Sequence, residues 1–287
     1  MAADLETGEV GCAVQSKYFS VGSVVPWVRA GVGAVATQAA GVAVYGSLVL
    51  DELHHGATPD DALAVVLADD PRRETRQLGV VTADGRAAAF TGSACNDWAG
   101  HRVGAGFAVQ GNILAGADVV DGMARAYETT VGPLVDRLVA ALEAGQAAGG
   151  DRRGQQSAAV IVERAGGRAE SREGIDRICD LRVEDHPEPI EELRRLAGIW
   201  SVWDAQRRAH TLYERGDPGA AADLLAATVE TREDANAIYN LACYESLAGR
   251  SRAAVAHVRR AIELDPSFAE LAARDTDLDP IRDLLAD

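Results

Sequence analysis

Short runs rich in valine and alanine, each bounded by glycine or proline, recur over the first 187 residues and then stop. Runs such as residues 9–16 and 31–39 have the length and composition of β-strands. Helical patterns separate these runs, over residues 47–55, 58–70, 118–129 and 133–147. This order of elements predicts an α+β domain in which helices lie on the outside of mostly antiparallel sheet.

The chain changes character after the His-Pro-Glu-Pro stretch at residues 186–189, because almost every later residue fits a helical pattern. Gly216 and Gly249 are 33 residues apart, and other small residues keep the same offset. A period near 34 is typical of helix-turn-helix repeats. Residues 237–266 resemble the tetratricopeptide repeat, and the unit before them is a degenerate copy. We therefore predict two domains, residues 1–187 and an all-α helical-repeat tail over residues 188–287.

The acidic composition excludes several classes of protein. The net charge is −16, from 44 acidic and 28 basic residues, whereas nucleic-acid binders need a concentrated basic surface. No apolar run is long enough to cross a membrane, and the acidic first residues are unlike a secretion signal. The four cysteines form no C-x-x-C pair, which excludes a zinc ribbon, and we expect them to be buried thiols in a reducing cytoplasm. We also expect no metal site and no cofactor.

A glutamine beside a small polar residue closes several of the strand-like runs. Ala-Val-Gln recurs at residues 13–15 and 108–110, and related runs contain Gln38 and Gln156. Either these are accidents of an alanine- and valine-rich chain, or they are strand ends that line one shared cleft. Strand ends at one edge of a sheet lie close in space. We therefore predict that Gln15, Gln38, Gln110 and Gln156 gather at one edge of the fold.

Five blocks of sequence occur in an order that is typical of one bacterial family. The blocks are residues 6–39, 91–101, 106–116, 149–159 and 180–190. Together they resemble the family named domain of unknown function 1028, over residues 4–196. The resemblance implies the fold of the N-terminal-nucleophile hydrolases, a four-layer αββα sandwich in which two stacked antiparallel sheets lie between layers of helices. A tetratricopeptide-like extension is also seen on some members.

The same resemblance implies a mechanism. These hydrolases use a Thr, Ser or Cys as the first residue of the mature chain, its α-amine is the general base, and nearby donors stabilise the oxyanion. Members of the family are expected to begin with a strand that carries Thr or Ser just after Met, whereas residues 1–9 here resemble only the end of that strand. Neither Met1 nor Ala2 can be the nucleophile. Three explanations stay open: the true chain is longer, the protein is non-catalytic, or cleavage between Gly11 and Cys12 frees a Cys12 nucleophile instead of leaving it as a core side chain.

Eleven polar residues are candidates for the lining of a substrate site, and they also have plainer interpretations. Gln110 and Asn112 would donate to an oxyanion or merely close turns, and Lys17 would lower the pKa of a nucleophile or end a strand in solvent. Asp151 and Arg153 would orient an amine or bind a substrate carboxylate, although we favour a structural ion pair. The full set is Gln15, Ser16, Lys17, Thr37, Gln38, Ser93, Gln110, Asn112, Asp151, Arg153 and Gln156.

The leading hypothesis is a cytoplasmic hydrolase of the N-terminal-nucleophile type that cleaves a small amide or other C–N bond, provided that its first strand supplies a Thr or Ser. The alternative is a non-catalytic ligand-binding or scaffold protein that uses the helical tail for protein–protein interaction. We expect a small-molecule substrate or ligand, no nucleic acid and no membrane. Two repeat units are fewer than a free-standing array needs, so we expect the tail to pack against the first domain or a partner chain. We also expect the protein to form a homodimer.

Overall fold

The computed structural model describes residues 1–167 and 175–285, which form two compact units. The first unit covers Met1–Ala197 and the second covers Gly198–Asp287. Helix α6 (Pro189–Glu214) begins in the first unit and ends in the second, so the division falls within a helix and not in a loop. The boundary placed at residue 187 from the sequence lies just before this helix begins.

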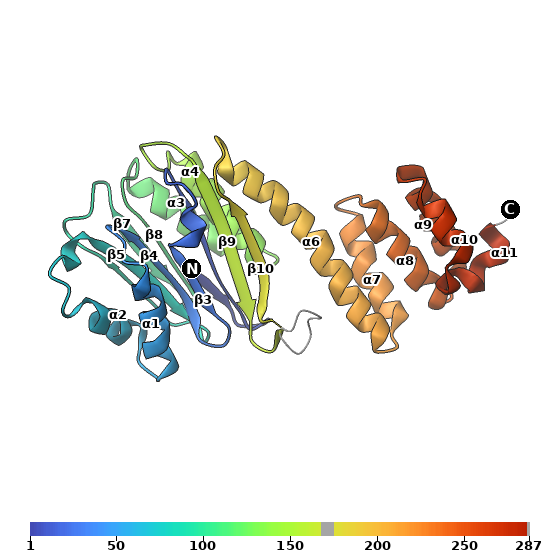
Figure 1. Ribbon diagram of the computed structural model, residues 1–287, viewed down its shortest axis with the longest axis horizontal. Helices are drawn as coiled ribbons and strands as arrows, with labels where there is room; N and C mark the ends of the chain where they lie inside the picture. The colour runs from blue at the N-terminus through green and yellow to red at the C-terminus, as the bar shows by residue number, and fades with distance from the viewer. Residues whose placement is uncertain (168–174, 286–287) are drawn as a thin grey trace. The chain divides into compact units, whose positions relative to one another are not determined.

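Two antiparallel sheets form the centre of the first unit (Figure 1). The large sheet has the strand order β10-β9-β2-β1-β8-β7, and the small sheet has the order β3-β4-β5-β6. Every neighbouring pair of these strands is antiparallel, which confirms the α+β class with antiparallel sheets. The strands are β1 (Ala2–Asp4), β2 (Glu9–Ser16), β3 (Pro26–Arg29), β4 (Gly33–Ala39), β5 (Arg76–Thr82), β6 (Ala87–Thr91), β7 (Gly100–Gly104), β8 (Phe107–Gly111), β9 (Ser157–Arg164) and β10 (Arg177–Val183).

Apolar side chains fill the space between the two sheets. Met1, Val10 and Val14 meet Ala34 and Val81 of the small sheet in one buried cluster. Side chains alternate between the two faces of a strand, so the residues next to these along the large sheet point away from the small sheet. This alternation decides which residues face the space between the sheets and which face the helices.

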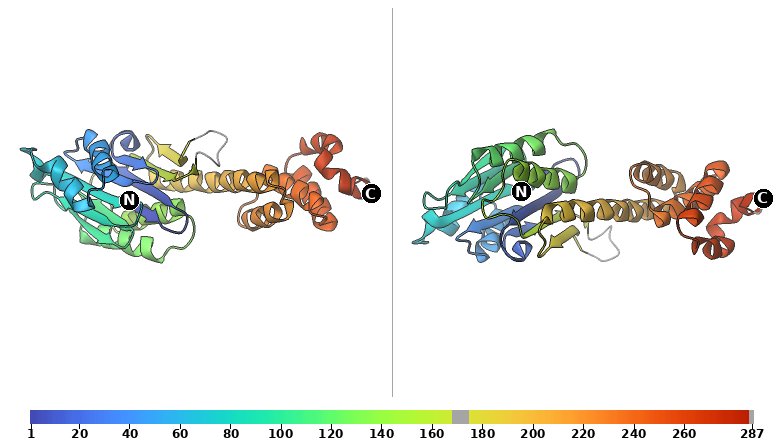
Figure 2. Two further views of the ribbon diagram at one scale, coloured as in Figure 1. Left: turned by 90° about the horizontal axis from the view of Figure 1, so that it is seen from below. Right: turned by 90° about the horizontal axis from the view of Figure 1, so that it is seen from above.

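A pair of helices packs on each sheet (Figure 2). Helices α1 and α2 contact the small sheet, where Val49, Leu53 and Leu63 join Val35 and Leu78 in a second buried cluster. Helices α3 and α4 contact strands of the large sheet. The bounds are α1 (Val44–His54), α2 (Pro59–Leu67), α3 (Ala117–Thr129) and α4 (Leu134–Ala147), with short 3₁₀ turns η1 (Val21–Ser23) and η2 (Arg73–Thr75).

Local sequence explains where several of these elements begin and turn. Thr58 caps α2, because its side-chain oxygen accepts a hydrogen bond of 3.2 Å from the Asp61 N–H. Pro59 stands at the start of the helix, where a missing N–H costs nothing. The turn between β5 and β6 contains Gly85 at a φ of 84°, a conformation that strains other residues.

The first turns of α6 are held to α4 by one arginine. Arg194 donates to Asp136 at 2.9 Å and to both oxygens of Glu143 at 2.8 Å. Burial raises the pKa of Asp136, and the charge of Arg194 opposes that rise. Ile190 and Leu193 of the same turns are buried, so apolar packing and charge pairing act together at this contact.

The second unit contains the end of α6 and helices that pack as successive neighbours. Ala209 of α6, Ala221 and Leu225 of α7, and Leu241 of α8 share one buried cluster. A second cluster joins α8, α9 and η3. The bounds are α7 (Pro218–Val229), α8 (Ala235–Leu247), α9 (Ser251–Leu264), α10 (Phe268–Arg274), η3 (Thr276–Ile281) and α11 (Arg282–Leu285). Of the helices in the described ranges, none combines the length and the apolar character that crossing a membrane requires.

The close approach of α1 to β3 yields a stability prediction. A Cβ added at Gly46 would lie only 2.1 Å from Cδ1 of the Trp27 indole, so Gly46→Ala should lower the free energy of unfolding by about 1–3 kcal/mol through overpacking. Gly122→Ala, also within a helix, meets its first neighbour at 3.4 Å and should be neutral or stabilising by up to about 1 kcal/mol. Urea denaturation of both variants measures the difference, and equal effects would contradict the packing explanation.

Candidate functional site

The large sheet is interrupted beside its shortest strand, β1. The first three residues of β2 pair with β1, whereas residues 12–16 pair with β9 on their other side alone. On β8, pairing with β1 is limited to Phe107, and residues 109–111 pair with β7 alone. Among the described residues, no strand lies between these two stretches, which we call the strand gap. Neighbouring strands lie about 4.8 Å apart, so the strand gap is one strand wide where it meets Met1.

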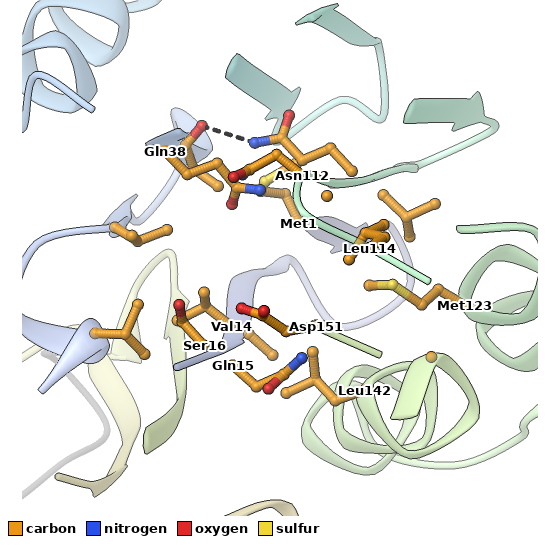
Figure 3. A pocket seen from close by; sticks show the side chains of 18 of the residues that line it. Met1, Val14, Gln15, Ser16, Gln38, Asn112, Leu114, Met123, Leu142 and Asp151 are labelled. Atoms are coloured by element: carbon orange, nitrogen blue, oxygen red, sulfur yellow. Dashed lines mark hydrogen bonds between the residues drawn. The ribbon is translucent and has the colours of Figure 1, made fainter. Parts of the chain in front are cut away.

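A pocket of about 440 Å³ occupies the strand gap (Figure 3). Val25 and Ala36 line it on the side of the small sheet. Met123 of α3 and Leu142 of α4 line it on the side of the helices. The pocket therefore has walls on both faces of the large sheet, which is possible because the sheet is open at this point.

Eight of the eleven candidate residues line this pocket. They come from the end of β2, the end of β4, the end of β8 and the loop between α4 and β9, which converge from distant parts of the sequence. Figure 3 shows several of them around the opening. The eight are Gln15, Ser16, Thr37, Gln38, Gln110, Asn112, Asp151 and Arg153.

The other three candidates lie outside the pocket lining, and their side chains bond elsewhere. Lys17 donates to the Gln155 carbonyl (3.1 Å), Ser93 donates to Glu74 (2.9 Å), and Gln156 donates to Asp185 (3.0 Å). Three of the four glutamines expected at one edge therefore line the pocket. Gln156 does not, because its side chain joins the loop after β10 instead.

Two glutamine side chains of the pocket lack a partner for their oxygen. Oε1 of Gln15 and Oε1 of Gln110 are buried and accept no hydrogen bond from the described residues. Gln110 is only 8% exposed, and its Nε2 donates to the Ala36 carbonyl at 3.3 Å. Buried polar atoms are nearly always hydrogen-bonded in folded proteins. These two oxygens therefore indicate that a donor group belongs in or beside the pocket.

An ion pair between Asp151 and Arg153 lies at the end of the pocket that Ser16, Gln38 and Asn112 also line, which we call the polar end. Asp151 is 7% exposed, and Arg153 donates two hydrogen bonds to its carboxylate, from Nε at 3.0 Å and from Nη2 at 2.6 Å. Burial alone would raise the pKa of Asp151, but the hydrogen bonds and charge of Arg153 outweigh it and hold this pKa below its usual range. The structural ion pair that the sequence favoured is therefore present, and it keeps a carboxylate ionised beside the end of β2.

Gln77 of β5 joins the two sheets at this end, and no pattern in the sequence singled it out. Its side chain is fully buried. Nε2 donates to the Gly111 carbonyl at 2.8 Å, to the Gly100 carbonyl at 3.2 Å and to Thr91 at 3.0 Å. Oε1 accepts from Gln38 at 2.9 Å and from Asn112 at 3.1 Å. Gln77 thus orients two of the pocket's amide side chains.

The α-amine of Met1 lies inside the fold, at the inner end of the strand gap. It donates to the Ala108 carbonyl at 3.0 Å, and burial lowers its pKa. Cys12, on β2, is also fully buried, and burial raises the pKa of its thiol. Cys12 is therefore a protonated core side chain in the middle of a strand, which agrees with the ordinary interpretation of its position and gives no support to cleavage at Gly11.

A group of three side chains outside the pocket has the ligand types of a metal site. Cys243, Asp275 and Asp277 of the second unit place ligand atoms within 4.8 Å of one another. Asp275 already accepts hydrogen bonds from the Tyr239 hydroxyl at 2.8 Å and from the Asp277 N–H at 3.0 Å. These bonds account for its position at the start of η3. Helix packing therefore explains this group, and we assign no metal to it.

Comparison with known proteins places the first unit among its relatives. The model of a family described as "Family of unknown function (DUF1028)" matches residues 1–193. A protein from Silicibacter pomeroyi, whose crystal structure bears the same family name, is 32% identical to this chain with a TM-score of 0.63. The match covers 71% of this chain and 91% of that one. No curated protein matches the chain.

The position of Gln77 leads to a prediction about the stability of the polar end. Gln77→Met keeps the shape of the side chain and removes all of its hydrogen bonds. Each buried carbonyl or amide left without a partner then lowers the free energy of unfolding by about 1–3 kcal/mol. We expect a loss of about 2–5 kcal/mol in the free energy of unfolding. Gln156→Met, which alters an exposed hydrogen bond, should change it by less than about 0.5 kcal/mol. Urea denaturation of both variants tests this, and similar losses would rule out the bridging role.

The ion pair at the pocket predicts a pH dependence. The pKa of Asp151 in the folded state is depressed relative to an unfolded value of about 3.9. Its carboxylate therefore stabilises the fold at pH values above that unfolded value, and this stabilisation is lost as the pH falls through the folded pKa. Asp151→Asn should be less stable than the parent chain at pH 7, and the difference should shrink in acid. A constant difference from pH 7 to pH 2, measured by thermal unfolding, would contradict this assignment.

Proposed function

The chain belongs to the DUF1028 family, and on this basis we propose that its first unit is a hydrolase domain of the N-terminal-nucleophile type, which cleaves a small amide or other C–N bond when an N-terminal Thr or Ser occupies the strand gap. Two observations support the fold part of the proposal. The two antiparallel sheets pack on each other, and each carries a pair of helices. A four-layer αββα sandwich with this arrangement is the fold that the family resemblance implies.

The observation that carries the proposal is the coincidence of the strand gap with the polar end of the pocket. A residue on a strand that filled the gap would lie beside Ser16, Asp151 and the amides of Gln38 and Asn112. An N-terminal Thr or Ser placed there would have the amide N–H donors of Gln38 and Asn112 beside it. With that residue in place, the cavity would hold a nucleophile, a base and oxyanion donors, which is what acyl transfer requires.

The proposed reaction assigns a role to each group. The hydroxyl oxygen of the nucleophile adds to the substrate carbonyl carbon, and its proton passes to the nucleophile's own α-amine. The C–N bond then breaks, the leaving nitrogen takes that proton, and water hydrolyses the acyl intermediate. Gln38 and Asn112 each use one side-chain N–H on Gln77, and the second N–H of each amide can donate to the oxyanion. Asp151, kept ionised by Arg153, orients the α-amine.

We propose in addition that the second unit is a tetratricopeptide-like module that contacts a protein partner. Gly216 and Gly249, 33 residues apart in the sequence, both have positive φ, 85° and 76°, and each follows the end of a helix. Asn240 donates to Gln206 at 2.8 Å, which links the equivalent helices α8 and α6 across 34 residues. This repetition supports the repeat assignment. The homodimer and the cytoplasmic location stay predictions from the sequence.

A gain-of-activity experiment tests the hydrolase proposal. Four residues are added before residue 1, the first of them a threonine freed as the N-terminus by proteolysis. The pairing of β1 with β2 places this threonine level with Ser16. We expect release of ammonia or amine from a panel of primary amides and N-acyl amino acids. Replacement of the threonine by valine should lower the rate by at least about a thousandfold, and Asn112→Ala should lower it by about a hundredfold.

Ser93→Ala is the matched control, because Ser93 lies outside the pocket and bonds to Glu74. Its rate should stay within about twofold of the threonine chain. A correctly folded threonine chain that hydrolyses none of the panel would reject the hydrolase proposal. It would favour the alternative, a non-catalytic binding or scaffold protein that keeps the pocket and uses the second unit for assembly.

A further inference from the structure

We propose that one face of α8, formed by Tyr239, Cys243 and Ser246, is a peptide-binding surface, which we call the α8 face. Residues 275–285 of the same chain, which we call the cover segment, occupy it. The partner of the second unit is an acidic peptide with the pattern Asp-x-Asp-Leu-x-x-Ile of residues 275–281, and it competes with the cover segment. The proposal rests on the contact of the second unit with a protein partner, and it names the surface and the chemistry of that contact.

Helix α8 is covered on nearly every side. A helix at the surface of a protein usually buries one face and exposes the opposite one. Nine of the ten residues from 237 to 246 are buried, and the three residues of the α8 face are at most 5% exposed. On α6, His210 and Tyr213 stand 33 positions before Cys243 and Ser246, and both are only half-buried. The α8 face is therefore covered where the equivalent part of α6 is partly open.

Two carboxylates of the cover segment contact this region. The Tyr239 hydroxyl donates to Asp275 at 2.8 Å, and the Cys243 thiol donates to the same carboxylate at 3.7 Å. Asp277 lies beside the Tyr213 hydroxyl of α6, and its negative charge raises the pKa of that hydroxyl. Two phenol groups thus face two carboxylates that are two residues apart in the sequence.

Two apolar side chains of the cover segment complete the contact. Leu278 is 0% exposed and Ile281 is 1% exposed, and both belong to the buried cluster that contains Tyr239 and Cys243. Side chains three residues apart in a 3₁₀ turn lie on the same side, so both can pack on α8 together. The α8 face therefore contacts acidic and apolar side chains in a fixed order along the cover segment.

The cover segment has the irregular backbone of a docked peptide and not that of a further repeat helix. α10 has seven residues and ends at Arg274, and Asp275 is extended, with φ −74° and ψ 119°. The next six residues form a 3₁₀ turn with Pro280 inside it. Hydrogen-bond geometry in 3₁₀ turns is poorer than in α-helices. The conformation of the cover segment thus depends on its side-chain contacts with the α8 face.

These contacts have an electrostatic cost. Ligand atoms of Cys243, Asp275 and Asp277 lie within 4.8 Å of one another. Burial and the neighbouring charge of Asp275 raise the pKa of Asp277. Like charges held close together in a partly buried place raise the free energy of the covered state. The repulsion lowers the free energy needed to open the cover segment, which is the step that a competing peptide requires.

The first test measures binding of a fluorescein-labelled peptide of residues 274–285 to the full chain by fluorescence anisotropy. The double variant Leu278→Ala/Ile281→Ala weakens the cover segment and leaves the α8 face unchanged. We expect this opened variant to bind the peptide at least about tenfold more tightly than the parent chain, because competition within the chain is reduced. A neutral peptide with Asp275→Asn and Asp277→Asn should bind the opened variant at least about tenfold more weakly.

A tyrosine pair on α8 provides matched receptor variants. Tyr239→Phe in the opened variant removes a hydroxyl that bonds to Asp275, and it should weaken peptide binding by about fivefold. Tyr244→Phe is the control, because Tyr244 lies on the same helix and packs in the cluster of α6 and α7. Its affinity should stay within about twofold of the opened variant.

A measurement on the parent chain applies even if the opened variant fails to fold. Amide hydrogen exchange of residues 276–285 is followed with and without a large excess of the unlabelled peptide. Displacement should speed the exchange of these amides by at least about threefold. Amides of α8 should keep their protection, because the added peptide takes the place of the cover segment.

Unchanged exchange of residues 276–285, or equal binding of the acidic and neutral peptides, would overturn the proposal and make the cover segment a fixed part of the fold. Both assays read the second unit, whereas the hydrolase test reads amide cleavage by the first, so each can fail without the other. A negative result rejects the α8 face and its ligand pattern. A partner protein that then still bound the full chain would show that another face of the second unit makes the contact.

Discussion

A strand inside a sheet must be hydrogen-bonded along both of its edges, and the large sheet departs from this rule beside Met1. β1 is three residues long, whereas its neighbour β2 is eight residues long. The mismatch leaves residues 12–16 of β2 and residues 109–111 of β8 separated by the width of a strand. The pocket, the buried α-amine and the unsatisfied glutamine oxygens all lie around that separation. They are best understood as consequences of one incomplete set of backbone hydrogen bonds.

The polar end of the pocket is held in place by a residue outside its lining. Gln77 sits in the small sheet and bonds to groups on β6, β7 and β8 and to both pocket amides. A single carboxamide thus joins the sheets where their strands end, in a dry environment that strengthens each bond. The ion pair of Asp151 and Arg153 closes the opposite side of the same end. Preorganised polar groups of this kind suit a site that must stabilise a developing charge.

Sequence patterns predicted the parts of this structure that depend on local chemistry. The helix within residues 58–70 and the antiparallel strands follow from residue type and spacing. The recurring glutamines at strand ends pointed to Gln15, Gln38, Gln110 and the nearby Asn112, which do line one pocket. Gln77 could not be singled out in this way, because nothing local distinguishes a bridging glutamine from a polar residue near the start of a strand. Gln156 shows the converse, since its run resembles the others while its side chain bonds to Asp185.

Helix α4 takes part in two contacts that lie on different sides of it. Leu138 and Leu142 line the pocket, while Asp136 and Glu143 hold Arg194 of α6. A ligand that displaced α4 from the pocket side would also act on the contact with Arg194, and thermodynamic linkage would make that influence reciprocal. One helix thus supplies both a wall of the pocket and the anchor for the first turns of α6.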